Sequence, residues 1–177
     1  MKKILVVVDM QNDFIDGALG TPEAAAIVEN VCAKIRSEEW DIIFATRDTH
    51  DDNYFETQEG QKLPIEHCIR TSRGWYLQDD VHKAIKYSNT GTKHVFNKPT
   101  FGSVTLANKL PKDIEAEFTI VGVCTDICVI SNALLLKAHY PEMNIIVDAS
   151  CCAGSTPEKH KMALEVMKSC QINVIGE

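Results

Sequence analysis

Apolar and polar residues follow each other in blocks along this chain, and four short apolar blocks lead to chemically reactive side chains. The blocks are rich in valine and isoleucine and bounded by polar residues, a pattern typical of strands buried on both faces of a sheet. Strands of a parallel sheet point the same way, so we expect the four reactive ends to share one edge, where open α/β sheets bind ligands. The blocks and the residues that follow them are Ile4–Val8 with Asp9, Ile42–Ala45 with Asp48, His94–Asn97 with Lys98, and Phe118–Val123 with Cys124 and Cys128.

The segments between these blocks predict helices, so strand and helix alternate along the chain. Pro22–Ser37 places Ile27, Val31 and Ile35 on one helical face, and Thr21 stands where an N-cap is expected. This alternation predicts an α/β fold: a doubly wound, mostly parallel, six-stranded sheet with helices on both faces, in a single domain over residues 1–177. The other predicted elements are helices over Asp79–Lys86, Gly102–Leu110, Thr125–His139 and Ser155–Cys170, and strands over Asp41–Thr46, Asn144–Ala149 and Ile172–Ile175.

Composition and charge narrow the class of protein. Of the 177 residues, 45% are apolar and 24% are charged, a balance that argues against intrinsic disorder. The net charge of −7 gives no general attraction to nucleic acid or to an anionic membrane. The apolar stretch after Lys2 and Lys3 is too short for a signal-peptide core or a membrane span. We therefore expect a cytoplasmic protein with neither nucleic-acid nor membrane partners.

Seven cysteines are an odd number for a chain without a recognisable secretory signal, which disfavours a disulfide scaffold. No C-x-x-C pair is present, which also disfavours a structural zinc site. Cys68 is left open because it follows His67. We expect four of the others to be small buried apolar side chains: Cys32, Cys151, Cys152 and Cys170.

Cys128 is the candidate nucleophile. It falls in the first turn of a predicted helix, where unpaired backbone N–H groups and the positive end of the dipole stabilise a thiolate. Lys98, at the end of a neighbouring strand, would add a positive charge, and Asp9 could accept the thiol proton. The alternative is an ordinary buried ion pair between Asp9 and Lys98 beside a core cysteine. Spacing alone does not separate these two interpretations.

A second group of residues has the composition of a metal site. Asp48 and His50 lie two apart on an extended segment that leaves a strand, so their side chains point the same way and can share an ion. His67, from the polar segment that follows, could complete an open site of mixed nitrogen and oxygen ligands. The alternative is that these histidines are ordinary residues of a polar loop. That interpretation is favoured for the other histidines: His82, His94, His139 and His160.

Three motifs together resemble those of the isochorismatase-like cysteine hydrolases. They are Val8–Phe14 (V-D-M-Q-N-D-F), Lys98–Ser103 (K-P-T-F-G-S) and Gly122–Val129 (G-V-C-T-D-I-C-V). Two further segments, Arg47–His50 and Leu63–Ile69, resemble the nicotinamidase branch of that family. The resemblance covers essentially the whole chain in the right order, and D-x-Q-x-D-F together with G-x-x-T-D-x-C-V is a specific combination. It therefore favours an active cysteine hydrolase.

The resemblance implies a catalytic triad of Asp9, Lys98 and Cys128. It also implies a cis peptide bond between Val123 and Cys124, which is unusual because cis peptide bonds normally precede proline. That bond would turn the backbone N–H groups of Cys124 and Cys128 into an oxyanion hole. Asp9 would deprotonate Cys128, and Lys98 would steady the thiolate and the carboxylate.

For the metal site, the resemblance implies one divalent ion: zinc first, with manganese or iron as alternatives. Its ligands would be Asp48, His50 and His67, with Glu59 from the same loop as a candidate fourth. In nicotinamidases this ion binds the pyridine nitrogen of the substrate.

The resemblance also implies a pocket wall, and here the chain departs from the family pattern. Phe14 and Phe101 would flank a planar ring. Leu63 and Val104 stand where aromatic residues are frequent, so the substrate is less certain than the type of reaction. Cys124 stands where a small or aliphatic residue is more usual, in a role that the backbone carries.

The function implied is hydrolysis of the carboxamide C–N bond of a small amide, first of all nicotinamide to nicotinic acid and ammonia through a cysteine thioester. One alternative is another small substrate, such as a carbamoyl or ureido compound or isochorismate. A second is a non-catalytic metal-binding or scaffold relative, which retention of all three triad residues disfavours. The small-molecule substrate is the expected partner, together with further copies of the chain in a homo-oligomer.

Overall fold

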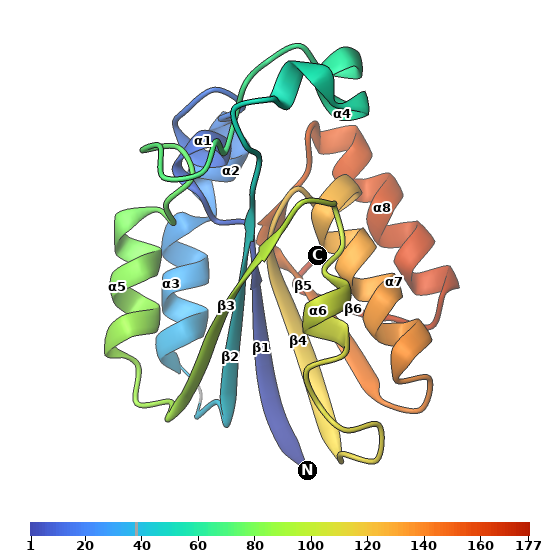
Figure 1. The fold of residues 1–177 in the computed structure, drawn as a ribbon. Coiled ribbons are helices and arrows are strands. Elements are labelled where there is room, and N and C mark those ends of the chain that lie inside the picture. The colour runs from blue at the N-terminus through green and yellow to red at the C-terminus, as the bar shows by residue number, and fades with distance from the viewer. Residues whose placement is uncertain (38) are drawn as a thin grey trace.

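The computed structural model describes residues 1–37 and 39–177, and the strands in those residues form one parallel sheet (Figure 1). The strand order is β3-β2-β1-β4-β5-β6, and each neighbouring pair runs parallel. The predicted sheet is thus confirmed, and it is entirely parallel. The strands are β1 (Lys2–Val8), β2 (Ile42–Asp48), β3 (Thr92–Lys98), β4 (Ala116–Val123), β5 (Asn144–Ala153) and β6 (Asn173–Ile175).

Helices cover both faces of the sheet, as predicted, with α3 and α5 on one side and α6, α7 and α8 on the other (Figure 1). Successive side chains of β1 point to opposite faces of the sheet. Ile4 and Val6 pack on the α7 side, while Leu5 and Val7 pack on the α3 side. The helices are α1 (Asn12–Ile15), α2 (Pro22–Ala26), α3 (Val28–Ser37), α4 (Gln58–Lys62), α5 (Asp79–Tyr87), α6 (Val104–Ala107), α7 (Ile130–His139) and α8 (Pro157–Ser169). Two shorter turns are the 3₁₀ turn η1 (Tyr54–Glu56) and the π-helical turn η2 (Thr125–Val129).

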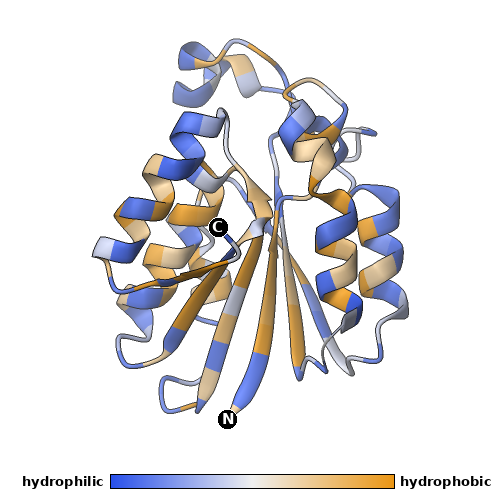
Figure 2. Ribbon diagram, turned by 180° about the vertical axis from the view of Figure 1, so that it is seen from behind, coloured by the Kyte–Doolittle hydropathy of each residue, from blue (hydrophilic) through white to orange (hydrophobic). Residues whose placement is uncertain are grey.

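Hydropathy follows this layering. Figure 2 shows apolar colour concentrated on the strands and on the inward sides of the helices, with polar colour on their outer sides. Among the described residues, no helix is both long and apolar enough to cross a membrane.

Three of the predicted helices differ clearly from the observed ones, and the helix predicted over Thr125–His139 consists of η2 followed by α7. The helix predicted over Pro22–Ser37 is divided at Ile27 into α2 and α3, although Thr21 does cap it, accepting from Ala24 N at 3.0 Å. The helix predicted over Gly102–Leu110 is reduced to the four residues of α6. A Cβ on Gly102 would lie 2.4 Å from Leu135 Cδ1, so the chain lies directly on α7 at this point.

Two predictions about burial are wrong. The strand around Val95 is not buried on both faces, because β3 is the edge of the sheet and Val95 remains 48% exposed. Cys170 is exposed, since it is the C-cap of α8 and lies beyond Met167, the last buried residue of that helix. Cys32 is buried, and so are Cys151 and Cys152 because β5 continues to Ala153.

Candidate active site and metal centre

The carboxyl ends of β1, β2, β3 and β4 bring the predicted site residues to one edge of the sheet. Asp9 follows β1, Asp48 ends β2, Lys98 ends β3 and Cys128 lies just beyond β4. Because β2, β1 and β4 are adjacent in the sheet, residues that are far apart in the chain become neighbours.

Asp9 and Lys98 form a buried ion pair. Lys98 Nζ lies 2.6 Å from Asp9 Oδ2, and the other carboxylate oxygen accepts from Thr46 Oγ1 at 2.6 Å. Burial raises the pKa of Asp9, and the attraction of Lys98 reduces this rise without cancelling it. Burial alone would lower the pKa of Lys98, but the nearby acidic groups, Asp9 first, outweigh it and the pKa is raised. Lys98 therefore stays protonated at any physiological pH.

Cys128 completes this group. Its Sγ is 3.5 Å from Lys98 Nζ, and its side chain is buried at the floor of a cavity. Burial, and then the charge of Asp9, raise the pKa of the thiol well above its usual value, while Lys98 acts in the opposite direction. The stabilisation of a thiolate expected from the helix position is therefore outweighed by burial in the resting protein. The thiol keeps its proton until Asp9 accepts it.

The turn that carries Cys128 is π-helical rather than α-helical. Val129 N donates to Cys124 O at 3.0 Å, a bond that spans five residues. Single π turns of this kind are frequent at functional sites. The Val123–Cys124 peptide bond is cis, as expected from the resemblance. Just before it, Gly122 has a φ of 120°, and a Cβ there would lie 2.1 Å from Val8 O, so only glycine fits between β4 and β1.

Asp48, His50, Glu59 and His67 form a cluster that could hold a metal ion. One ligand atom from each lies within 4.8 Å of all the others. Asp48 Oδ2 is 3.0 Å from His50 Nε2 and 3.4 Å from His67 Nε2, and Glu59 Oε1 is 3.7 Å from His67 Nε2. Two imidazoles and two carboxylates converging in this way are a donor set suited to zinc, manganese or iron. The predicted ligands Asp48, His50 and His67 do meet, and Glu59, the candidate fourth, joins them from α4.

Hydrogen bonds from surrounding residues fix the positions of the side chains in this cluster. The backbone oxygen of Ile65 lies 2.9 Å from His67 Nδ1, which leaves Nε2 directed at the cluster. Gln11 is fully buried and fixes the end of β2 through its side-chain amide: Oε1 accepts from Asp48 N at 2.6 Å, and Nε2 donates to Asp48 O at 2.9 Å. Asp13 Oδ2 accepts from Cys68 N at 2.7 Å, beside His67. The D-x-Q-x-D motif thus supports the segments that carry Asp48 and His67.

A cavity of about 350 Å³ connects the cluster to Cys128. Phe14 and Phe101, predicted to flank a ring, both line it, and so does Leu63. Val104 does not line it. The complete lining is Phe14, Leu19, Asp48, Gln58, Glu59, Lys62, Leu63, His67, Pro99, Thr100, Phe101, Cys124, Ile127 and Cys128.

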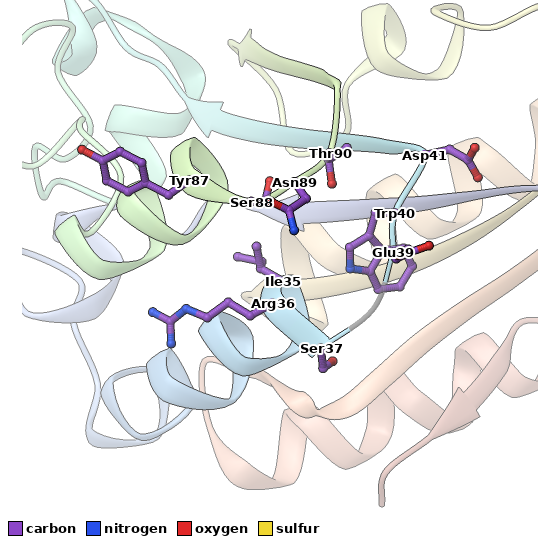
Figure 3. A pocket seen from close by; sticks show the side chains of 10 residues that line it. All are labelled: Ile35, Arg36, Ser37, Glu39, Trp40, Asp41, Tyr87, Ser88, Asn89 and Thr90. Carbon is purple, nitrogen blue, oxygen red and sulfur yellow. The ribbon is translucent and has the colours of Figure 1, made fainter.

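A larger hollow, of about 720 Å³, lies at the opposite end of the sheet (Figure 3). The side chains that border it, among them Arg36, Trp40, Asp41 and Tyr87, come from the end of α3, the residues just before β2, the end of α5 and the segment after α5. None of the site residues described above borders it. Size alone therefore does not identify the reactive cavity.

Several residues around the site were not predicted from the sequence. Thr46 holds Asp9, and Asn132 contacts the backbone of Cys128. His160 was assigned to a polar surface, yet its Nδ1 lies 2.8 Å from the buried hydroxyl of Thr125 at the start of η2. Of these, only Asn132 left a trace in the sequence, as a polar residue inside an apolar run.

Comparisons with known proteins agree with this geometry. The family model of the isochorismatase domain matches residues 3–176. The nicotinamidase of Saccharomyces cerevisiae is 26% identical, with 99% of this chain and 100% of that protein covered. A crystal structure of the pyrazinamidase of Pyrococcus horikoshii in complex with zinc has a TM-score of 0.76 and 28% identity, covering 100% of both chains. A nicotinamidase from Bacillus subtilis has the same TM-score and identity, over 98% of this chain and 99% of that one. The chain therefore belongs to the isochorismatase family.

Proposed function

We propose that this protein hydrolyses nicotinamide to nicotinic acid and ammonia, with Asp9, Lys98 and Cys128 as its catalytic residues. The observation that carries the proposal is that one largely apolar cavity is bordered by Cys128 at one point and by the metal-binding cluster at another. A planar ring with an amide on one side and a basic nitrogen on the other suits this arrangement. The similarity to the nicotinamidases of yeast and Bacillus subtilis supports it.

The first half of the reaction forms a thioester. Asp9 takes the proton of the Cys128 thiol, and the sulfur attacks the amide carbon. The backbone N–H groups of Cys124 and Cys128 are proposed to stabilise the oxyanion. Asp9 returns the proton to the amide nitrogen, the C–N bond breaks and ammonia leaves. Lys98 remains charged and holds both anionic groups in place.

The second half regenerates the enzyme. Asp9 accepts a proton from a water molecule, whose oxygen attacks the thioester carbon. The C–S bond then breaks, and the departing sulfur takes up the proton held by Asp9, so that Cys128 returns to its thiol form and Asp9 to its carboxylate. The acid product leaves with both oxygens on the former amide carbon.

Asp48, His50, Glu59 and His67 are proposed to hold one divalent ion, zinc first. When bound, the ion supplies a Lewis acid for the ring nitrogen of the substrate. Phe14 and Phe101 would exclude water from the two sides of the ring. In this assignment the cluster binds and orients the substrate, and proton transfer is left to Asp9.

We also infer that residues 1–177 form one catalytic domain, that the protein is cytoplasmic and that it assembles as a homo-oligomer. The described cysteines are all free thiols, a condition that suits a reducing compartment.

The test is ammonia release from a panel of amides. The purified protein would be supplied with nicotinamide, pyrazinamide, a ureido compound and an aliphatic amide, and isochorismate would be followed separately. Nicotinamide is expected to have the highest kcat/KM. Leu63 lines the cavity where an aromatic residue is frequent in the family, and this favours a second candidate, a bulkier small amide. Turnover of such an amide without nicotinamide turnover would favour that candidate.

A further inference from the structure

Asn132 is a polar residue in a buried position. It lies on α7, one helical turn beyond Cys128, and its side chain is 1% exposed. A buried amide is costly unless its donors and its acceptor find partners. In Asn132 they do. Nδ2 donates to Cys128 O at 2.8 Å and to Phe101 O at 3.2 Å, and Oδ1 accepts from Ser103 N at 2.9 Å.

These hydrogen bonds join two segments that are distant in the chain. One is the turn η2, which carries Cys128. The other, residues 98–103, begins at Lys98 and includes Phe101 in the cavity wall. The position of residues 98–103 relative to η2 determines whether the Lys98 ammonium lies beside the Cys128 sulfur. It also determines the shape of the cavity.

The packing leaves little room for another arrangement. Gly102 rests on Leu135, with no space for a Cβ, and Ser103 caps α6 by accepting from Leu106 N at 3.1 Å. The hydrogen bond from Thr100 Oγ1 to Gly102 O is internal to the segment and does not bind it to α7. The Asn132 amide links the 98–103 segment to α7 by polar contacts, in addition to the contact of Lys98 Nζ with Cys128 Sγ.

We propose that Asn132 is a positioning residue of this active site, which holds the 98–103 segment in register with the carbonyl of Cys128. The proposal rests on the proposed function for its choice of substrate. Without these bonds, Phe101 would lose its fixed place in the wall and KM would rise. Lys98 would also lose its alignment with Cys128, and kcat would fall.

Two substitutions of Asn132 test its hydrogen bonds to residues 101 and 103. The hydroxyl of Asn132→Ser can bond the carbonyl four residues earlier, so it retains a link to Cys128 and loses those to Phe101 and Ser103. Asn132→Leu keeps similar volume and loses all three. Asn108→Ala is the matched control, because Asn108 Nδ2 donates to Val104 O at 2.9 Å on the exposed end of α6.

The experiment combines nicotinamide kinetics, measured well below the melting temperature, with amide hydrogen exchange. In Asn132→Ser, kcat/KM is expected to fall by about tenfold or more, with a raised KM, and amides in 99–103 to exchange faster. Asn132→Leu should show the same if it folds, and Asn108→Ala should change neither quantity. A residue of purely structural importance would lower Tm and leave KM unchanged at that temperature.

Folded Asn132→Ser with wild-type kcat/KM and KM would overturn the proposal. The failure of the proposed function would look different, because the wild-type protein itself would release no ammonia from nicotinamide. In that case hydrogen exchange decides: faster exchange confined to 99–103 supports the positioning of this segment by Asn132, and unchanged exchange overturns it.

Discussion

Lys98 Nζ lies 2.6 Å from Asp9 Oδ2, and the two side chains are 1% and 0% exposed. Within the described residues, Oδ2 makes this ion pair yet accepts no hydrogen bond of normal geometry, whereas the other oxygen is bound by Thr46. The first oxygen is therefore free to accept a proton from the neighbouring thiol. Because burial raises the pKa of Asp9, this carboxylate is a stronger base than one on the surface.

Cys128→Ala should abolish nicotinamide turnover, with a loss of about 10⁴-fold or more, because no other group can form the thioester. The fold and the binding of nicotinic acid should persist, since the change removes one sulfur atom from the cavity floor. Ammonia release and a binding isotherm measure the two effects. Cys170→Ala, at an exposed position, is the control and should retain full activity. Normal turnover in Cys128→Ala would show that the nucleophile lies elsewhere.

Lys98→Ala should reduce kcat/KM by about 10²- to 10⁴-fold and raise the pKa of the Cys128 thiol further. The sign follows from the charge: the ammonium favours the thiolate, so its removal favours the protonated form. The rate of iodoacetamide labelling of Cys128, followed by mass spectrometry, should then begin to increase only at higher pH than in the wild type. Lys62→Ala, which changes a lysine at the exposed rim of the same cavity, provides the control. An unmoved labelling profile in Lys98→Ala would remove Lys98 from this role.

Much of the architecture was accessible from the sequence because the apolar blocks are short, rich in β-branched residues and separated by helical periodicity. The ends of these blocks alone predict that Asp9, Asp48 and Lys98 lie at one edge of the sheet. The sequence pattern does not show which strand lies at the edge of the sheet or where a helix ends. The exposure of Val95 depends on the position of β3 in the sheet order, and the exposure of Cys170 depends on where α8 ends.

The site was predicted where a motif carries the chemistry, and residues that act only through tertiary contacts were missed. Glu59, a candidate fourth ligand from its place in the loop, does join the cluster, because α4 folds back over the strand ends, above the sheet (Figure 1). The protonation of the Cys128 thiol also depends on tertiary contacts, because burial and the charge of Asp9 raise its pKa against the effect of Lys98. Thr46 gave no signal at all, since a threonine in a strand is ordinary.

His67→Ala should lower the metal content of the purified protein and raise KM for nicotinamide while Cys128 can still be labelled. The substitution removes one of the converging nitrogen donors and leaves the Asp9–Lys98 pair intact. Elemental analysis, kinetics and the stabilisation of Tm by added zinc are the measurements. His82→Ala, which changes an exposed histidine, should behave as the wild type. Chelation should reproduce the defect, and zinc should reverse it.

A purely structural role of the cluster would give different results. If its residues only tie the 49–74 segment to the sheet, His67→Ala would lower Tm, and the wild-type protein would contain no metal. Full nicotinamide turnover by metal-free protein would remove the substrate-holding role of the cluster.

Thr46→Val should move the acidic limb of the kcat/KM profile to higher pH. The Thr46 hydroxyl donates to Asp9 Oδ1, and such a bond favours the ionised carboxylate and lowers the pKa of Asp9. Valine has nearly the same shape and no donor, so the pKa should rise. Asp9 acts as a base only when ionised, and activity should therefore be lost at a higher pH as the solution is acidified.

The measurement is kcat/KM for nicotinamide across the acidic range, with Thr119→Val as control. Thr119 is also a buried threonine of the sheet, on β4, and its substitution should leave the limb in place. At high pH, where Asp9 is ionised in both proteins, Thr46→Val should recover most of its activity, because the defect is one of protonation. A uniform loss at every pH would mean instead that Thr46 serves only to hold Asp9 in place, and an unchanged profile would exclude any influence of this hydroxyl on the base.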